Sequence, residues 1–204
     1  ARLERFADAF PDAGDWQNRL RDWWLKHPRS ATIPGWDFIS TCEIDGKRGL
    51  VLIEAAADQS ELNNAGMPVT KRKSKEAQLR SDENDEHIRG ALEFASSALN
   101  SLMPGTTLSA DDRYELSSRV AHAWWLANNG IPVVLMYLGF LHDQRAEASD
   151  ETFTSQADWL TGFENYCRGI LPDGFTGRWV DCGLASFYVL ANALETARPK
   201  TRAS

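Results

Sequence analysis

Two acidic side chains stand in stretches of the sequence that are otherwise apolar. Asp37 lies in "GWDFIS", and Glu54 ends the apolar run "GLVLIE" just before three alanines. Between them lies "IDGKRG", which favours a tight hairpin turn because Asp-Gly supplies the positive φ values that such a turn needs. A hairpin with its midpoint near residue 46 has Asp37 nine residues before that midpoint and Glu54 eight residues after it. We therefore expect the two carboxylates to lie approximately opposite one another.

Two neighbouring carboxylates on an apolar hairpin indicate a cation site. Their charges repel one another, so both stay ionised at low cost only if a cation lies between them. Hard divalent ions such as Mg²⁺ are held by one or two carboxylates, with water and substrate phosphate as further ligands, and they activate water near a phosphoryl group. The alternative is that Asp37 and Glu54 are solvent-facing strand ends. That alternative is the safer one for a single acid, but the apolar surroundings and the offset favour a metal site for the pair.

The spacing of these residues resembles a known motif. Pro34–Asp37, sixteen intervening residues and then Glu54-Ala55 are similar to the PD-(D/E)xK nuclease superfamily, in which an Asp leads a hairpin and the next strand carries Glu or Asp, any residue, and Lys. The resemblance implies an α/β fold with a restriction-endonuclease-like core, a mixed β-sheet flanked by helices. It also implies metal-dependent hydrolysis of phosphodiester bonds in DNA with Mg²⁺ or Mn²⁺. Asp37, Glu54 and the backbone carbonyl of Ala55 would hold the metal ion.

The motif lysine is missing, because position 56 is alanine. In the family this Lys acts as a flexible point charge near the attacked phosphate, which Ala56 cannot do. We consider three explanations: an engineered Lys-to-Ala form that binds without cutting, a natural non-cleaving relative, or a basic residue that reaches the site from Lys47 or from 71–75. We favour the first explanation, and we expect the chain as written to cut little.

The resemblance also suggests further site residues elsewhere in the chain. A third acid is expected on the first helix, where Glu4 is the first choice, ahead of Asp15 and Asp22; Glu61 is an additional candidate. The basic stretch "KRKSKEAQLR" either contacts nucleic-acid phosphates, since Lys and Arg neutralise them, or is a solvated loop. Its candidate residues are Lys71, Arg72, Lys73 and Lys75. His87 could face the site and its nucleic acid from the next helix, although a position on the helix surface is the safer expectation for it, and Arg119 could point the same way from the following helix.

Composition and charge are those of a single globular domain spanning residues 1–204, with residues 198–204 as a frayed tail. The chain is 43% hydrophobic and 25% charged, and its net charge is -7. An acidic total argues against nucleic-acid binding through bulk charge but permits a local basic groove. Three widely separated cysteines favour reduced thiols and a cytoplasmic location. We expect no signal peptide and no membrane-spanning helix, because apolar runs are too short.

Hydrophobic periodicity predicts alternating helices and strands. The expected helices cover residues 1–27, 85–100, 109–130 and 151–170, and residues 60–84 are expected to be a polar loop. Strands are expected near residues 36–39, 50–55 and 131–141, whereas 180–197 is expected to be mixed and to end in a helix. The run "LVLI" predicts a strand buried on both faces. In "HAWWLA", we expect two of the three large apolar side chains to be buried.

Two other functions fit the same sequence. The chain could be a non-catalytic nuclease-fold subunit that serves binding or assembly in a bacterial defence or repair complex, which Ala56 favours. It could also be an interaction module that uses its eight tryptophans, with both acids incidental. Under the nuclease interpretation the partner is DNA, and a homodimer is expected because cutting two strands calls for two sites.

Overall fold

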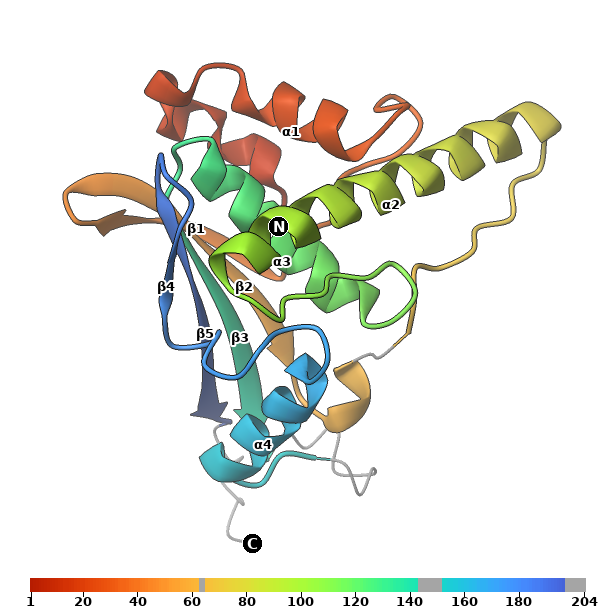
Figure 1. The fold of residues 1–204 in the computed structure, drawn as a ribbon. Coiled ribbons are helices and arrows are strands. Elements are labelled where there is room, and N and C mark those ends of the chain that lie inside the picture. Colours follow the sequence, from red (N-terminus) through yellow and green to blue (C-terminus); the bar gives the residue numbers. More distant parts are fainter. Residues whose placement is uncertain (63–64, 143–151, 197–204) are drawn as a thin grey trace, which may run out of the picture.

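The computed structural model describes residues 1–62, 65–142 and 152–196. The chain forms an α/β fold with one five-stranded mixed sheet in the order β1-β2-β3-β5-β4, which confirms the expected class (Figure 1). The strands are β1 (Phe38–Ile44), β2 (Lys47–Ala56), β3 (Val133–Leu141), β4 (Trp179–Asp181) and β5 (Ser186–Glu195). The α-helices are α1 (Trp16–Trp24), α2 (Lys75–Leu102), α3 (Tyr114–Asn128) and α4 (Gln156–Cys167), and the 3-10 helices are η1 (Leu3–Ala9), η2 (Pro11–Ala13) and η3 (Gln59–Glu61).

The predicted hairpin is formed by β1 and β2. Asp45 and Gly46 have φ values of 52° and 76°, which are the left-handed conformations that a two-residue hairpin turn requires. The antiparallel register runs from Ile44↔Lys47 at the turn to Phe38↔Ile53 at the open end. The turn therefore sets which residues face one another along the whole hairpin.

The centre of the sheet is parallel. Strand β2 pairs with β3, and β3 pairs with β5, both in parallel register. The expectation that residues 180–197 end in a helix is wrong, because Ser186–Glu195 is strand β5. Its "ANALE" segment has helix-forming residues, but nine consecutive pairings with β3 override that local preference.

The N-terminal helix and the basic loop also differ from expectation. Residues 1–27 form η1, η2 and α1 instead of one helix; Gly14 lies between η2 and α1 with a φ of 62°. The expected loop over 60–84 is wrong from Lys75 onward, where α2 begins. Ser74 caps this helix by accepting a hydrogen bond from the Ala77 N–H, and the charged residues that follow are good helix formers.

Helix α3 is enclosed on all sides. Every residue from Leu116 to Ala127 is buried, since α3 packs on β3 and β5 and also against α2, while its tryptophans contact Trp23 of α1. Trp124, Trp125 and Leu126 are therefore all buried, not two of the three as expected. A helix in this position has no solvent face.

The helices cover one face of the sheet. Side chains of β3 alternate between buried and half-buried, and both α3 and α4 pack on β3 and β5 from one side of the sheet (Figure 1). Tyr137 of β3 points to this side, because its ring contacts that of Phe163 in α4. The expected burial of β2 on both faces is not found: Leu50 and Leu52 are buried, whereas Val51 and Ile53 are half-buried. None of the described helices is long and apolar enough to cross a membrane.

Close packing of α4 on the sheet depends on Gly139. A Cβ atom at this position would lie 2.4 Å from Cδ2 of Trp159, whose side chain is fully buried. We predict that Gly139→Ala lowers the free energy of unfolding by about 1–3 kcal/mol, as expected for overpacking. Urea denaturation measures this change. The control is Gly90→Ala in α2, where a Cβ atom meets nothing within 4 Å and stability should rise by up to about 1 kcal/mol; a neutral Gly139→Ala would contradict the packing argument.

Candidate functional site

A pocket of about 370 Å³ lies where β2 ends. Its walls come from β2, from η3, from the first turns of α3, from Tyr137 on β3 and from Tyr166 on α4. Strands β2 and β3 are parallel, so their carboxyl ends lie at the same edge of the sheet (Figure 1). This edge is where open α/β sheets usually bind their ligands.

The pocket contains both acids that the sequence singled out. The last pair at the open end of the hairpin is Phe38 with Ile53. Asp37 precedes Phe38 and Glu54 follows Ile53, so the two acids lie opposite one another, as the predicted offset requires. Asp37 is exposed, and its Oδ2 accepts a hydrogen bond of 2.8 Å from the Ala55 N–H. Asp37 thus closes the open end of the hairpin and keeps its other carboxylate oxygen available to the pocket.

Glu54 is paired with an arginine. Arg119 Nε lies 2.6 Å from Glu54 Oε1, and the two side chains are only 9% and 12% exposed. The second contact of the guanidinium is Glu115, one helical turn earlier, at 3.1 Å. The Arg119 guanidinium also lies 4.7 Å from the centre of the Trp36 ring, which is a favourable distance for a cation above an aromatic face.

Several polar atoms in this pocket are buried without an aligned hydrogen bond. They are Glu54 Oε1, Arg119 Nε and the Tyr137 hydroxyl; the first two are close enough for an ion pair, but the N–H does not point at the oxygen. Burial raises the pKa of Glu54 to about 7, with a further rise from the Asp37 charge, and the Arg119 charge opposes this rise. Unsatisfied buried polar groups usually indicate a ligand or ordered water.

The position of the missing lysine also faces the pocket. Ala56 lies two residues after Glu54 on the same face of β2, and it lines the pocket. Lys47 cannot replace that lysine, because it begins β2 about 23 Å from Glu54 at the usual rise of a strand. Among the residues that the structure describes, Arg119, which the sequence named as a candidate, is the cationic side chain that lines the pocket.

The oxygen ligands of this pocket suit a hard divalent metal ion. Among the described residues, no group of three or more His, Cys, Asp or Glu could hold a metal ion. Asp37 and Glu54 supply two hard carboxylates, which fit Mg²⁺ or Mn²⁺ when water and substrate provide the other ligands.

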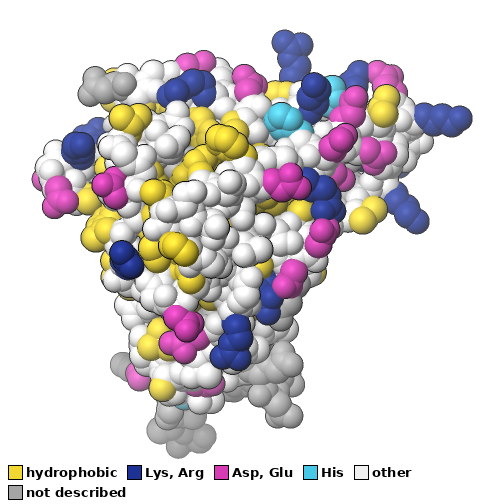
Figure 2. Space-filling view, viewed as in Figure 1, with side chains coloured by type: hydrophobic (Ala, Val, Ile, Leu, Met, Phe, Trp, Pro, Cys, Tyr) yellow, Lys and Arg dark blue, Asp and Glu magenta, His cyan; other side chains and the backbone are white. Residues whose placement is uncertain are grey.

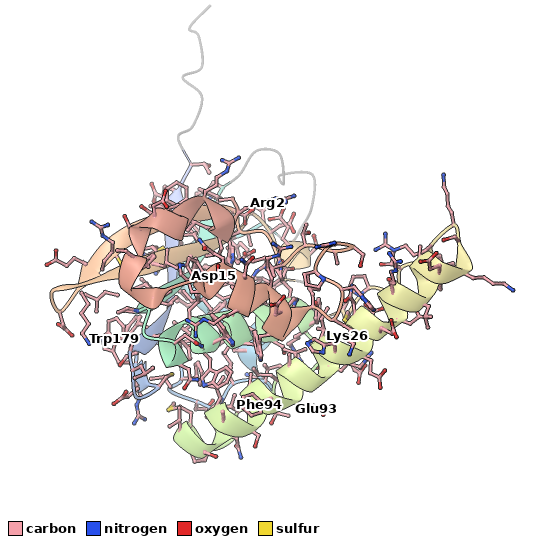
Figure 3. All side chains as sticks on the ribbon, turned by 90° about the horizontal axis from the view of Figure 1, so that it is seen from above. Arg2, Asp15, Lys26, Glu93, Phe94 and Trp179 are labelled. Carbon is pink, nitrogen blue, oxygen red and sulfur yellow. The ribbon has the colours of Figure 1, made fainter. Side chains whose placement is uncertain are left out.

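The other predicted acids have different positions. Glu61 lines the pocket, but its Oε2 accepts a hydrogen bond of 2.5 Å from the Ala57 N–H. The backbone of Glu4 lies in η1, and its side chain is outside the part that the structure describes. Asp15 precedes α1 and Asp22 lies within it; neither lines the pocket, and Figure 3 shows Asp15 at the start of α1, on the upper surface of the molecule.

The predicted nucleic-acid contacts do not line this pocket. Lys71, Arg72, Lys73 and Lys75 are exposed, and Arg72 lines a separate hollow with Ser30 and Asn84. Acidic side chains are interspersed with the basic ones over this end of α2 (Figure 2), and Glu76 pairs with Arg80. The described residues therefore form no purely basic groove over this end of α2.

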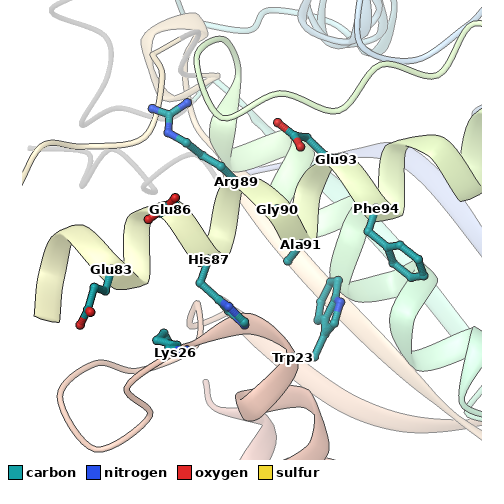
Figure 4. Close-up of a pocket in the computed structure, with 10 residues that line it drawn as sticks. All are labelled: Trp23, Lys26, Glu83, Glu86, His87, Arg89, Gly90, Ala91, Glu93 and Phe94. Carbon is teal, nitrogen blue, oxygen red and sulfur yellow. The ribbon is translucent and has the colours of Figure 1, made fainter.

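His87 lines a third hollow, of about 860 Å³, between α1 and α2 (Figure 4). Trp23 and Phe94 contribute apolar surface there, while Lys26 and Glu83 bring charges of opposite sign. His87 is therefore not brought to the pocket of Asp37 and Glu54, which agrees with the alternative of a helix-surface position. We place the candidate site in the smaller pocket, because Asp37 and the buried ion pair of Glu54 and Arg119 line it.

Sequence reasoning missed several residues of the site. Tyr137 stands opposite Glu54 in the parallel register, and its hydroxyl is a single polar atom in an apolar strand, which was a usable signal. Glu115 was missed although it has the i,i+4 spacing of a helical ion pair with Arg119, which the sequence had already named. Nothing in the sequence placed Tyr166, which depends on how α4 packs against the sheet.

Comparison with family models, with curated proteins and with solved structures found no match for this chain. Function must therefore be inferred from the residues of the pocket and their geometry.

The raised pKa of Glu54 predicts a pH-dependent stability. The folded pKa of about 7 lies above the ordinary value of 4.5 for a glutamate carboxyl, so the folded state holds the proton more tightly. This contribution is present below about pH 4.5 and is lost as the pH rises through 7; it amounts to about 3 kcal/mol. We predict that Glu54→Gln removes this part of the pH dependence in urea denaturation between pH 4 and 8.

A matched variant tests whether Glu54 itself is responsible. Glu115→Gln removes the other carboxylate contact of Arg119 and leaves Glu54 in place. The Glu115 charge makes only the smallest contribution to the raised pKa of Glu54, so this variant should keep most of the wild-type dependence on pH. If Glu54→Gln and the wild type lose the same stability between pH 4 and 8, the pKa assignment is wrong.

Proposed function

We propose that this protein is a nuclease-type domain whose pocket binds a divalent metal ion and a phosphodiester of DNA. The supporting observation is that Asp37, Glu54 and position 56 line one pocket at the end of a single hairpin. The pocket suits an anionic substrate that arrives with a metal ion. It offers the exposed carboxylate of Asp37, the buried carboxylate of Glu54 and the buried cation of Arg119 at an open edge of the sheet. The sheet order and the hairpin are also compatible with a restriction-endonuclease-like core.

The two carboxylates have different roles in this proposal. Asp37 and Glu54 would hold the ion, which when bound polarises a phosphoryl oxygen and lowers the pKa of a bound water molecule. Asp37 is held in place by the Ala55 N–H, so its orientation does not depend on the ligand. Tyr137 and Tyr166 close the inner wall of the pocket and restrict the entry of bulk water.

Arg119 takes part of the role of the missing lysine. It is the cation that lines the pocket, and its fork of N–H donors matches a phosphate oxygen pair better than a lysine does. Its orientation is controlled by Glu115 and Trp36. A guanidinium does not readily give up a proton, so Arg119 would bind the phosphate without serving as a base. The chain with Ala56 should therefore bind substrate more readily than it cuts it.

Ala56 also supports a second candidate function, a nuclease-fold subunit that binds without catalysis in a larger complex. The Arg119–Glu54 pair neutralises the buried carboxylate without a metal ion. A buried ion pair that needs no metal ion suits a subunit in which Glu54 stabilises the fold and has no catalytic role. The two candidates differ in whether a lysine at position 56 creates activity.

Metal binding is tested without any measurement of cleavage. We predict that the wild-type chain binds Mn²⁺ in electron paramagnetic resonance titrations of free Mn²⁺. Asp37→Asn, which keeps an acceptor for the Ala55 N–H, should weaken binding at least about tenfold, equivalent to about 1.4 kcal/mol. Asp22→Asn, on exposed α1, is the control and should bind like the wild type. Equal affinities for all three chains would contradict the metal site.

Cleavage is tested by restoring the lysine. We predict that Ala56→Lys nicks or linearises plasmid DNA with Mg²⁺ or Mn²⁺ at least about 100-fold faster than the wild type, the scale at which one preorganised electrostatic group acts. Ala56→Met, of similar length without the charge, is the control and should stay inactive. Adding Asp37→Ala to the lysine variant should abolish cutting. If the lysine variant binds Mn²⁺ and still does not cut, the non-catalytic subunit is the better description.

A further inference from the structure

We propose that the protein forms a homodimer in which two copies stack through the face of the sheet that α3 and α4 leave uncovered. This open sheet face is defined by the outward side chains of the three central strands, chiefly Val51, Ile53, Val134, Met136, Leu138 and Leu190. The inference is independent of the proposed function, because it depends on the sheet and not on the pocket.

The strand register identifies this face. Leu52, Leu135 and Val189 are paired neighbours, and all are buried beneath the helices. Side chains alternate across a strand, so residues one position away point to the opposite side. There Val134 and Met136 are only half-buried although they lie on the central strand. Among the described helices, those that pack closely on the sheet all do so from the other side (Figure 1).

Exposed aromatic side chains mark the margins of the same face. Phe38, which pairs with outward-facing Ile53, is 55% exposed, and Trp179, which pairs with Tyr188, is 45% exposed. Trp179 and Lys26 lie on opposite sides of the molecule (Figure 3), so this surface is distinct from the hollow between α1 and α2. Contiguous apolar surface of this extent usually marks an interface.

The strand sequences themselves call for cover on both faces. Parallel strands are normally buried on both sides and are then apolar throughout. β2 contains "LVLI", and β3 is "VVLMYLGFL" along its whole length. Both strands therefore have the composition of strands that are buried on both faces, whereas the described helices cover only one of their faces.

The charge of the face indicates the occupant. The outward positions from Gly49 to Ala55, Val134 to Phe140 and Tyr188 to Leu194 include no charged residue. A nucleic acid would need basic side chains there. A second copy needs none, because an isologous interface only has to complement itself, and two chains of net charge -7 repel least where their contact surfaces are uncharged.

The size of the face suits a stable dimer. The five strands hold 39 residues, and at about 4.8 Å spacing and about 3.3 Å rise they cover roughly 600 Å², which is the lower end of the range for stable interfaces. A standard stable interface buries about 800 Å² on each partner. Two twisted sheets stack in this way in β-sandwiches, with their strands about 30° apart. The pockets lie on the helix side of each copy, so stacking would leave both accessible.

The experiment measures the mass of the full chain by light scattering and sedimentation at concentrations from about 1 to 100 μM. We expect the wild type to reach twice 22.8 kDa. Met136→Glu introduces a charge at the centre of the face and should weaken dimerisation at least about 100-fold, since unpaired buried charges are costly. The control is Leu79→Glu on α2, an apolar residue that is 59% exposed away from this face, and it should leave the dimer intact.

A second variant allows for the chance that Met136→Glu fails to fold, which circular dichroism would reveal. Phe38→Ser combined with Trp179→Ser changes only side chains that are about half exposed in one copy, so folding should be retained. We expect dimerisation to weaken at least about tenfold. A wild-type chain of 22.8 kDa at every concentration would overturn the proposal, as would a dimer that both folded face variants leave unchanged.

Discussion

The structure depends on how the buried positive charge of Arg119 is accommodated. Arg119 lies in a helix whose residues from Leu116 to Ala127 are all buried, and a buried guanidinium is tolerated only when it is paired. Its partners are Glu54 at the end of β2, Glu115 on its own helix and the ring of Trp36. Removing one partner of a buried pair typically costs about 3–5 kcal/mol. One side chain therefore holds together the central helix, the central sheet and the segment that leads into the hairpin.

The same pairing constrains what the pocket can bind. Glu54 is held by Arg119, so a metal ion that takes this carboxylate leaves the guanidinium in need of another anion. A phosphate oxygen is such an anion. Under the proposed function, metal and phosphate would therefore bind favourably together and less favourably alone, because each one satisfies a charge that the other has released. Burial, which raises the pKa of Glu54, strengthens this coupling by penalising any unpaired state.

Local signals predicted the hairpin and its carboxylates, whereas long-range packing decided the rest. Asp45-Gly46 specifies a two-residue turn, and the turn specifies the register that brings Asp37 and Glu54 together. Strand β5 was missed because its alanines and leucines favour a helix until β3 supplies pairing. The pocket's tyrosines, Tyr137 and Tyr166, lie 100 and 129 residues along the chain from Asp37, so no local pattern could group them with it.

The apolar run of β2 predicts burial on both faces of the strand, but the helices of one copy bury only one face. Four successive apolar residues indicate burial on both faces, yet Val51 and Ile53 are half-buried where Leu50 and Leu52 are fully covered. The polar pocket and the uncovered face belong to opposite sides of the same strands. The helix side therefore can accommodate buried charges for chemistry, and the other side can stay largely apolar for association, since alternation along each strand keeps the two sets of side chains apart.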